Sequence, residues 1–118
     1  LIKNGVLCSF ATDFPVVQYY DTFQELQTGL TRKPAKSSPE YGLYDNIPVP
    51  YKATLDEMLV TLTIAGAYQL SFDDITGSFE VGKSADFVIL DQNIETINIE
   101  DIENIKIDRM IVMGGEIC

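Results

Sequence analysis

The first hydrophobic pattern in the chain is a near-continuous apolar run from Val6 to Ala11. A run without polar alternation is typical of a parallel strand that is buried on both faces, with neighbouring strands on each side. The run is followed at once by Asp13, and Pro15 comes two residues later. The aspartate has two interpretations, a turn residue after a strand or a catalytic metal ligand at the end of one.

The second pattern predicts a helix over residues 20–31. Its apolar positions recur every three or four residues: Tyr20, Phe23, Leu26 and Leu30. Asp21 or Thr22 is placed to cap its N-terminus, and Gly29 lies near its end.

A longer helix is predicted over residues 54–70. Thr54 and Glu57 have the spacing of a capping box, in which each side chain pairs with the other's backbone N–H. One face then carries the apolar stripe Leu55, Met58, Leu59, Leu62, Gly66 and Leu70. The small residues at 65–67 predict close approach of another element.

Beyond Ser71 the pattern changes to that of strands. The run Phe87–Leu90 predicts one strand, residues 98–104 a short helical turn, and residues 105–112 a second strand. Gly114-Gly115 is a two-residue hairpin signal. The expected order is therefore strand, helix, long loop, helix and a small β unit.

The long loop covers residues 31–53 and contains four prolines. Loops of more than about 15 residues are uncommon in compact domains and often line functional sites. This one is either a surface excursion or the wall of a site. The candidate lining residues are Arg32, Tyr41, Tyr44 and Tyr51.

Composition excludes several classes of function. The formal net charge of the 118 residues is −10. This charge would repel the phosphates of nucleic acid and an anionic lipid surface. No apolar run approaches the ~20 residues of a membrane span. Histidine is absent, so the chain contains no Ser-His-Asp triad and no histidine-built zinc site. Cys8 and Cys118 are expected to be free thiols in a reducing compartment, and we expect a cytoplasmic protein.

Three stretches together resemble a known family. Residues 77–91, "GSFEVGKSADFVILD", are similar to the G-x-x-x-x-G-K-x-A-D-x-V-x-x-D stretch near the C-terminus of metal-dependent amidohydrolases. Residues 108–117, "DRMIVMGGEI", resemble their final β-hairpin. Residues 5–16, "GVLCSFATDFPV", resemble their last barrel strand, which ends in G-(S/T)-D-x-P. The order of these motifs, with a helix ending in Thr-Arg and a long loop between them, resembles amidohydrolase family 3.

The resemblance implies an α/β fragment of a longer protein, and the first residue, Leu1 rather than Met, agrees with that expectation. Residues 1–75 would be the last strand-helix unit of a TIM-like barrel, and residues 76–118 part of a small β-sandwich (composite) domain. In such a fragment Val6–Ala11 and the 54–70 stripe would lose their partners, so we expect the isolated chain to self-associate. Sedimentation at high concentration tests this, and a clean monomer would contradict it.

The resemblance also implies a function, which is hydrolysis of non-peptide carbon–nitrogen bonds in a small amide-type substrate. Asp13 would be a metal ligand and the catalytic general acid/base, and Arg32 would meet a polar substrate group. The cofactor of the intact protein would be a divalent metal, with zinc the expected ion. The remaining ligands would be histidines N-terminal to Leu1, so the fragment alone is expected to be inactive and to bind no metal.

Other interpretations remain open from the residues themselves. Asp86, in "SADFVILD", is interpreted as structural, because it resembles a family position that begins a strand of the small domain, remote from the metal. Ala11-Thr12 stands where the family more often has Gly-Ser. Thr12 keeps the hydroxyl group of the usual serine. The alternative function is a non-catalytic acidic α+β module for binding or regulation.

Overall fold

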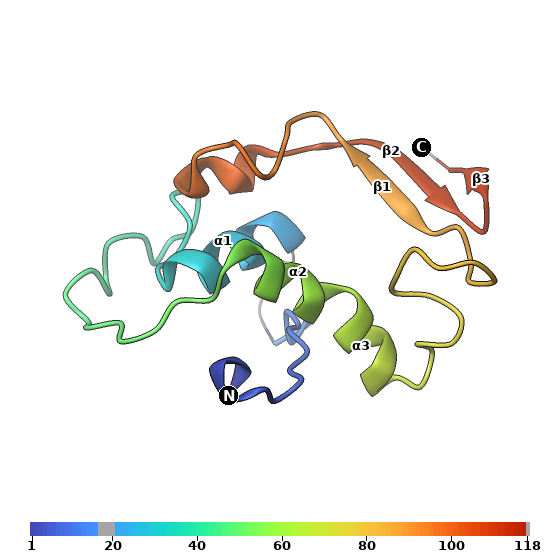
Figure 1. Cartoon of the computed structure of the whole chain (residues 1–118). Helices are drawn as coiled ribbons and strands as arrows, with labels where there is room; N and C mark the ends of the chain where they lie inside the picture. The colour runs from blue at the N-terminus through green and yellow to red at the C-terminus, as the bar shows by residue number, and fades with distance from the viewer. Residues whose placement is uncertain (17–20, 118) are drawn as a thin grey trace.

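The computed structural model describes residues 1–16 and 21–117. Tyr20 of the predicted helix and the thiol of Cys118 lie outside these residues. The elements are η1 (Ile2–Asn4), α1 (Thr22–Thr31), α2 (Leu55–Leu62), α3 (Ile64–Gln69), β1 (Phe87–Leu90), η2 (Ile99–Asn104), β2 (Ile107–Val112) and β3 (Gly115–Glu116). Figure 1 shows three helices grouped together, with η2 above α1 and the β-hairpin at the far end. No helix in the described part of the chain is long and apolar enough to cross a membrane.

Helix α1 begins where its sequence predicts. The Asp21 carboxylate accepts hydrogen bonds from the backbone N–H groups of Phe23 at 2.8 Å and Gln24 at 3.2 Å. These bonds satisfy two of the N–H groups that lack a partner at a helix start, which confirms Asp21 as the N-cap. The helix ends at Arg32, which has a left-handed backbone with φ 60°.

The capping box of α2 is also confirmed. The Thr54 hydroxyl accepts from the Glu57 N–H at 3.2 Å, and the Glu57 carboxylate accepts from the Thr54 N–H at 2.8 Å. The box fixes the start of the helix at the end of the long loop.

The single helix predicted over residues 54–70 is wrong, because the structure has two helices that divide at Thr63. The hydroxyls of Thr61 and Thr63 donate to the carbonyls of Met58 and Leu59, each at 2.7 Å. Such bonds to the preceding turn compete with the backbone ladder and bend helices. The predicted stripe also ends early, because Leu70 is 67% exposed.

The core joins three segments that are far apart in sequence. Its buried members are Leu26 and Leu30 from α1, Met58 from α2, Ile102 from η2, and Ile105. The Met58 side chain of α2 packs directly against Gly29 of α1, where a Cβ atom would collide with the Met58 Cε and Sδ. The regions 1–75 and 76–118 therefore share one core, because η2 packs on α1.

The strand predicted over Val6–Ala11 is wrong for the structure of this chain, which is irregular there (Figure 1). Its one backbone bond to another segment runs from the Phe10 N–H to the Thr61 carbonyl at 3.2 Å, within the described residues. Val6 is 46% exposed and Leu7 53% exposed. A strand needs a neighbouring strand to pair with, and none of the described residues supplies one.

The C-terminal strands confirm the predicted β unit and its short helical turn, now η2. Strand β2 lies between β1 and β3, both antiparallel to it, with Phe87 opposite Ile111. The hairpin turn predicted at Gly114-Gly115 is displaced by one residue. Its central residues are Met113 and Gly114, with φ 50° and 77°, while Gly115 already belongs to β3. Two positive φ angles are typical of the tight turn that matches strand twist.

Asp86 holds this turn through the backbone of Met113. Its carboxylate accepts from the Met113 N–H at 2.7 Å, from Ser84 Oγ at 2.8 Å and from Thr76 Oγ1 at 3.0 Å. The bond from Met113, followed by those from Ser84 and Thr76, holds the pKa of Asp86 below its ordinary value. Asp86 thus links the turn to the segment before β1, in keeping with its structural interpretation.

We predict that Asp86→Asn lowers the urea midpoint of unfolding, because the neutral amide offers only one accepting oxygen. Since the folded pKa is below the unfolded value of about 3.9, the contribution of Asp86 is present above that pH and is lost as the pH falls through the folded pKa. The wild-type chain should therefore lose more stability than the variant on acidification. Asp74→Asn is the control, because the structure gives that exposed side chain no hydrogen bond among the described residues. Equal midpoints for the two variants would contradict the role of Asp86.

The close approach predicted for residues 65–67 is present at Gly77. A Cβ atom there would lie 2.7 Å from the Ala67 Cβ and 3.0 Å from the Ile64 Cα, and its φ is 91°. At Gly82 the φ is 100°, but a Cβ would meet nothing within 4 Å.

Both Gly77→Ala and Gly82→Ala strain the backbone, but only Gly77→Ala also overpacks α3. We therefore predict that Gly77→Ala reduces the free energy of unfolding by about 1–3 kcal/mol more than Gly82→Ala does. Urea titration of both variants measures the difference. Equal reductions in the free energy of unfolding for the two variants would show that the contact with α3 is unimportant.

Candidate functional site

Asp13 occupies a tight turn directly after the irregular apolar segment. Its backbone is left-handed, with φ 58°, and its carbonyl accepts from the Val16 N–H at 2.8 Å. The Thr12 Oγ1 accepts from the Phe14 N–H at 3.0 Å. Aspartate tolerates a left-handed backbone better than most residues, and such conformations cluster at functional sites.

The turn does not use the Asp13 carboxylate. Within residues 1–16 and 21–117 this exposed side chain makes no hydrogen bond and no ion pair. An aspartate that only stabilises a turn accepts an N–H group from its own backbone two residues on. Here the residue two positions on is Pro15, which has no N–H group, so this turn bond cannot form. Both carboxylate oxygens of Asp13 are therefore without a partner in the described part of the chain.

A carboxylate oxygen suits a divalent metal, but one carboxylate does not complete a site, because zinc takes four ligands. The described residues contain no group of three or more Cys, Asp or Glu side chains that could hold a metal ion. Asp13 therefore fits as one ligand, and the described residues do not bring together a complete ligand set.

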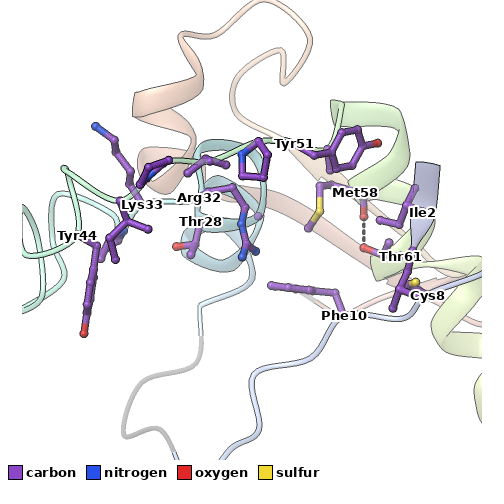
Figure 2. Close-up of a pocket in the computed structure, with 18 of the residues that line it drawn as sticks. Ile2, Cys8, Phe10, Thr28, Arg32, Lys33, Tyr44, Tyr51, Met58 and Thr61 are labelled. Atoms are coloured by element: carbon purple, nitrogen blue, oxygen red, sulfur yellow. Dashed lines mark hydrogen bonds between the residues drawn. The ribbon is translucent and has the colours of Figure 1, made fainter. Parts of the chain in front are cut away.

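The described residues form a groove of about 810 Å³. Its walls come from the Cys8–Phe10 segment, the end of α1, the long loop and α2. Figure 2 shows Phe10 and Met58 on its apolar side, with Arg32 and Tyr44 toward the loop. The long loop is thus the wall of a groove, although Tyr41 is not among the lining residues.

Arg32 lines this groove, whereas Asp13 does not. Arg32 follows the last residue of α1, and the Asp13 turn precedes the first residue of that helix. Ten helical residues rise about 15 Å, so α1 separates the two positions along the chain. The Arg32 side chain forms no ion pair within the described residues, while the adjacent Lys33 pairs with Asp45 at 3.1 Å.

Tyr51 lines the groove and has a shifted pKa. Its hydroxyl donates to both carboxylate oxygens of Glu57, at 2.7 and 2.8 Å. This bond raises the pKa of Tyr51, and the Thr54 N–H followed by the Tyr51 hydroxyl lowers the pKa of Glu57. The tyrosine is therefore held in its protonated form as part of the α2 cap.

Glu103 was not singled out by its sequence pattern. Its carboxylate meets the backbone of the long loop at Lys36 and Ser37, which lie more than 60 residues earlier. No local signal in "NIEDIEN" distinguishes this glutamate from its acidic neighbours, so only the folded chain identifies it.

Comparison with known proteins identifies the family. The model of the amidohydrolase family matches residues 1–117, nearly the whole chain. The chain therefore belongs to the amidohydrolase family, and the resemblance carried by its three motifs is confirmed.

Two curated relatives and one solved structure place the match within longer proteins. The 5-methylthioadenosine/S-adenosylhomocysteine deaminase of Thermoanaerobacter pseudethanolicus is 35% identical over 92 residues, which are 77% of this chain and 19% of the deaminase. The imidazolonepropionase of Bdellovibrio bacteriovorus is 41% identical over 46 residues, 39% of this chain and 11% of that protein. The crystal structure of an amidohydrolase from Thermotoga maritima MSB8 is 25% identical, with a TM-score of 0.65 over 99% of this chain and 24% of that one. The chain thus spans less than a quarter of each of these proteins.

Proposed function

We propose that this chain is the C-terminal part of a metal-dependent hydrolase of non-peptide carbon–nitrogen bonds, with Asp13 as metal-site general acid/base. The observation that carries the proposal is the Asp13 carboxylate, which is exposed and has no hydrogen bond or ion pair among residues 1–16 and 21–117. The names of the two curated relatives, a deaminase and an imidazolonepropionase, support a reaction at carbon–nitrogen bonds in small molecules.

The segment before Asp13 supports a barrel strand that is completed by other residues of a longer protein. The amides of Leu7, Cys8 and Ser9 make no hydrogen bond within the described residues, and the apolar side chain of Leu7 is exposed. An unpaired, apolar segment can satisfy its backbone by pairing with strands on either side. In this proposal residues 1–75 close a TIM-like barrel, and residues 76–118 belong to a small β-sandwich.

The proposed chemistry assigns a proton-transfer role to Asp13. A bound divalent metal would lower the pKa of a water molecule toward ~7 and polarise the carbon under attack. An Asp13 Oδ accepts the proton of the attacking water and later donates it to the leaving nitrogen, which departs as an amine or ammonia. The carboxylate suits this exchange because its own turn makes no demand on either oxygen.

The proposed role of Arg32 is limited to contact with the substrate. It lines the groove rather than the Asp13 turn, and it has no carboxylate partner in the described residues. It would contact a polar substrate group only if that group extends into the groove.

In the longer protein, we predict that Asp13→Asn lowers kcat by about 10²–10⁴-fold, because the amide cannot accept the proton. Circular dichroism should be unchanged, since the carboxylate makes no hydrogen bond in its turn. Asp74→Asn, which removes the same charge from an exposed position, should retain full turnover. Near-normal kcat for Asp13→Asn would remove Asp13 from the mechanism. A sequence before Leu1 that lacks an HxH after a strand would instead favour the non-catalytic acidic module.

A further inference from the structure

The long loop is fixed to the rest of the molecule at one short stretch. The Glu103 carboxylate, on η2, accepts from the Lys36 N–H at 2.9 Å and from the Ser37 N–H at 3.1 Å, and also from the Ser37 hydroxyl. Ala35, immediately before this stretch, is only 2% exposed. These contacts fix the backbone of the loop where it passes η2.

Glu103 is itself held by α1. Its backbone N–H donates to the Oε1 of Gln27 at 2.8 Å, and Gln27 is only 3% exposed. One turn earlier on the same helix, the Nε2 of Gln24 donates to the Ser37 Oγ at 2.8 Å. Glu103, Ser37, Gln24 and Gln27 therefore form one network, called the clasp below, which joins η2, the loop and α1.

The charges around the clasp favour an ionised Glu103. Partial burial alone would raise the pKa of Glu103, but the bonds from the Ser37 hydroxyl and the two loop amides outweigh it and lower that pKa. The other charged groups at this point are Lys36 and Asp101, which pair at 2.9 Å with both side chains close to half exposed. Exposed ion pairs contribute little, so the carboxylate-to-backbone bonds are the main attachment.

The clasp lies between loop residues that line the groove. Lys33 and Pro34 line the groove on one side of it in sequence, and Glu40 and Tyr44 line it on the other. Beyond the clasp the loop extends away from the helices, as Figure 1 shows for the segment between α1 and α2. Residues 39–48 are all exposed, so contacts within that part of the loop do little to hold it.

We infer that Glu103 is a positioning residue that fastens the long loop to η2 and thereby sets the loop wall of the groove. This role goes beyond the proposed hydrolase function and does not depend on it. It also makes the C-terminal region, through η2, a determinant of the shape of a hollow built by the N-terminal region.

Amide hydrogen exchange of the 118-residue chain tests the clasp directly. Glu103→Gln keeps the shape of the side chain but can no longer accept both loop amides strongly, so the exchange rates of Lys36 and Ser37 should rise about tenfold. Ser37→Ala, which removes only the hydroxyl, should raise the Lys36 rate less. Glu100→Gln, on the same element, and Asp101→Asn should change both rates less than twofold. Unchanged rates in Glu103→Gln would overturn the proposal.

A second measurement tests the groove wall. The chain has no tryptophan, so Tyr44→Trp provides a single fluorescent reporter on the loop. The acrylamide quenching constant of Trp at this position should rise about twofold when Glu103→Gln is added, and should stay unchanged with Glu100→Gln. A constant that does not change with Glu103→Gln, while amide exchange at residues 36–37 increases, would show that the clasp does not set the wall.

Discussion

The packing of α1 between α2 and η2 is the interaction on which the rest of the structure depends. Leu26 and Leu30 close the core against Met58, and Gly29 leaves room for the Met58 side chain. Because this one helix is shared, the groove and the clasp are both positioned relative to it. The groove lies at its C-terminal end, and the clasp is fastened to its Gln24 and Gln27 side chains. The C-terminal region is also part of the same unit, since η2 covers α1.

The Asp13 turn is held by bonds that do not involve the Asp13 carboxylate. The hydroxyl of Thr12 accepts from the backbone N–H of Phe14, and the Asp13 carbonyl accepts from the Val16 N–H. Pro15 has no N–H group to donate to the carboxylate, which has no hydrogen bond in the described residues. In the proposed function both carboxylate oxygens are thus available to a metal or a proton.

Local signals predicted the features that depend only on nearby residues. The Asp21 cap, the Thr54–Glu57 box and β1 each follow from a few adjacent residues, and all are present. The predictions that the structure corrected concern features with partners that are distant in sequence or absent from the described residues. The Val6–Ala11 run did not become a strand because the described chain offers it no partner. The displaced hairpin turn is held by a hydrogen bond from the Met113 N–H to Asp86, 27 positions away. For the site, Asp13 stays a prediction from its motif. The sequence offered the long loop as one possible wall of a site, but it did not indicate the attachment of that loop to η2.

We propose that the Asp13 carboxylate belongs to a metal site completed by residues N-terminal to Leu1 in a longer protein. Anomalous diffraction from crystals of that longer protein, grown with zinc and measured at the zinc absorption edge, shows directly whether Asp13 is a ligand. We expect an anomalous peak within coordination distance of an Asp13 Oδ atom, about 2.0–2.2 Å, with histidine nitrogens among the other ligands. A zinc ion that is fully coordinated elsewhere, with the Asp13 carboxylate facing solvent, would rule out this role.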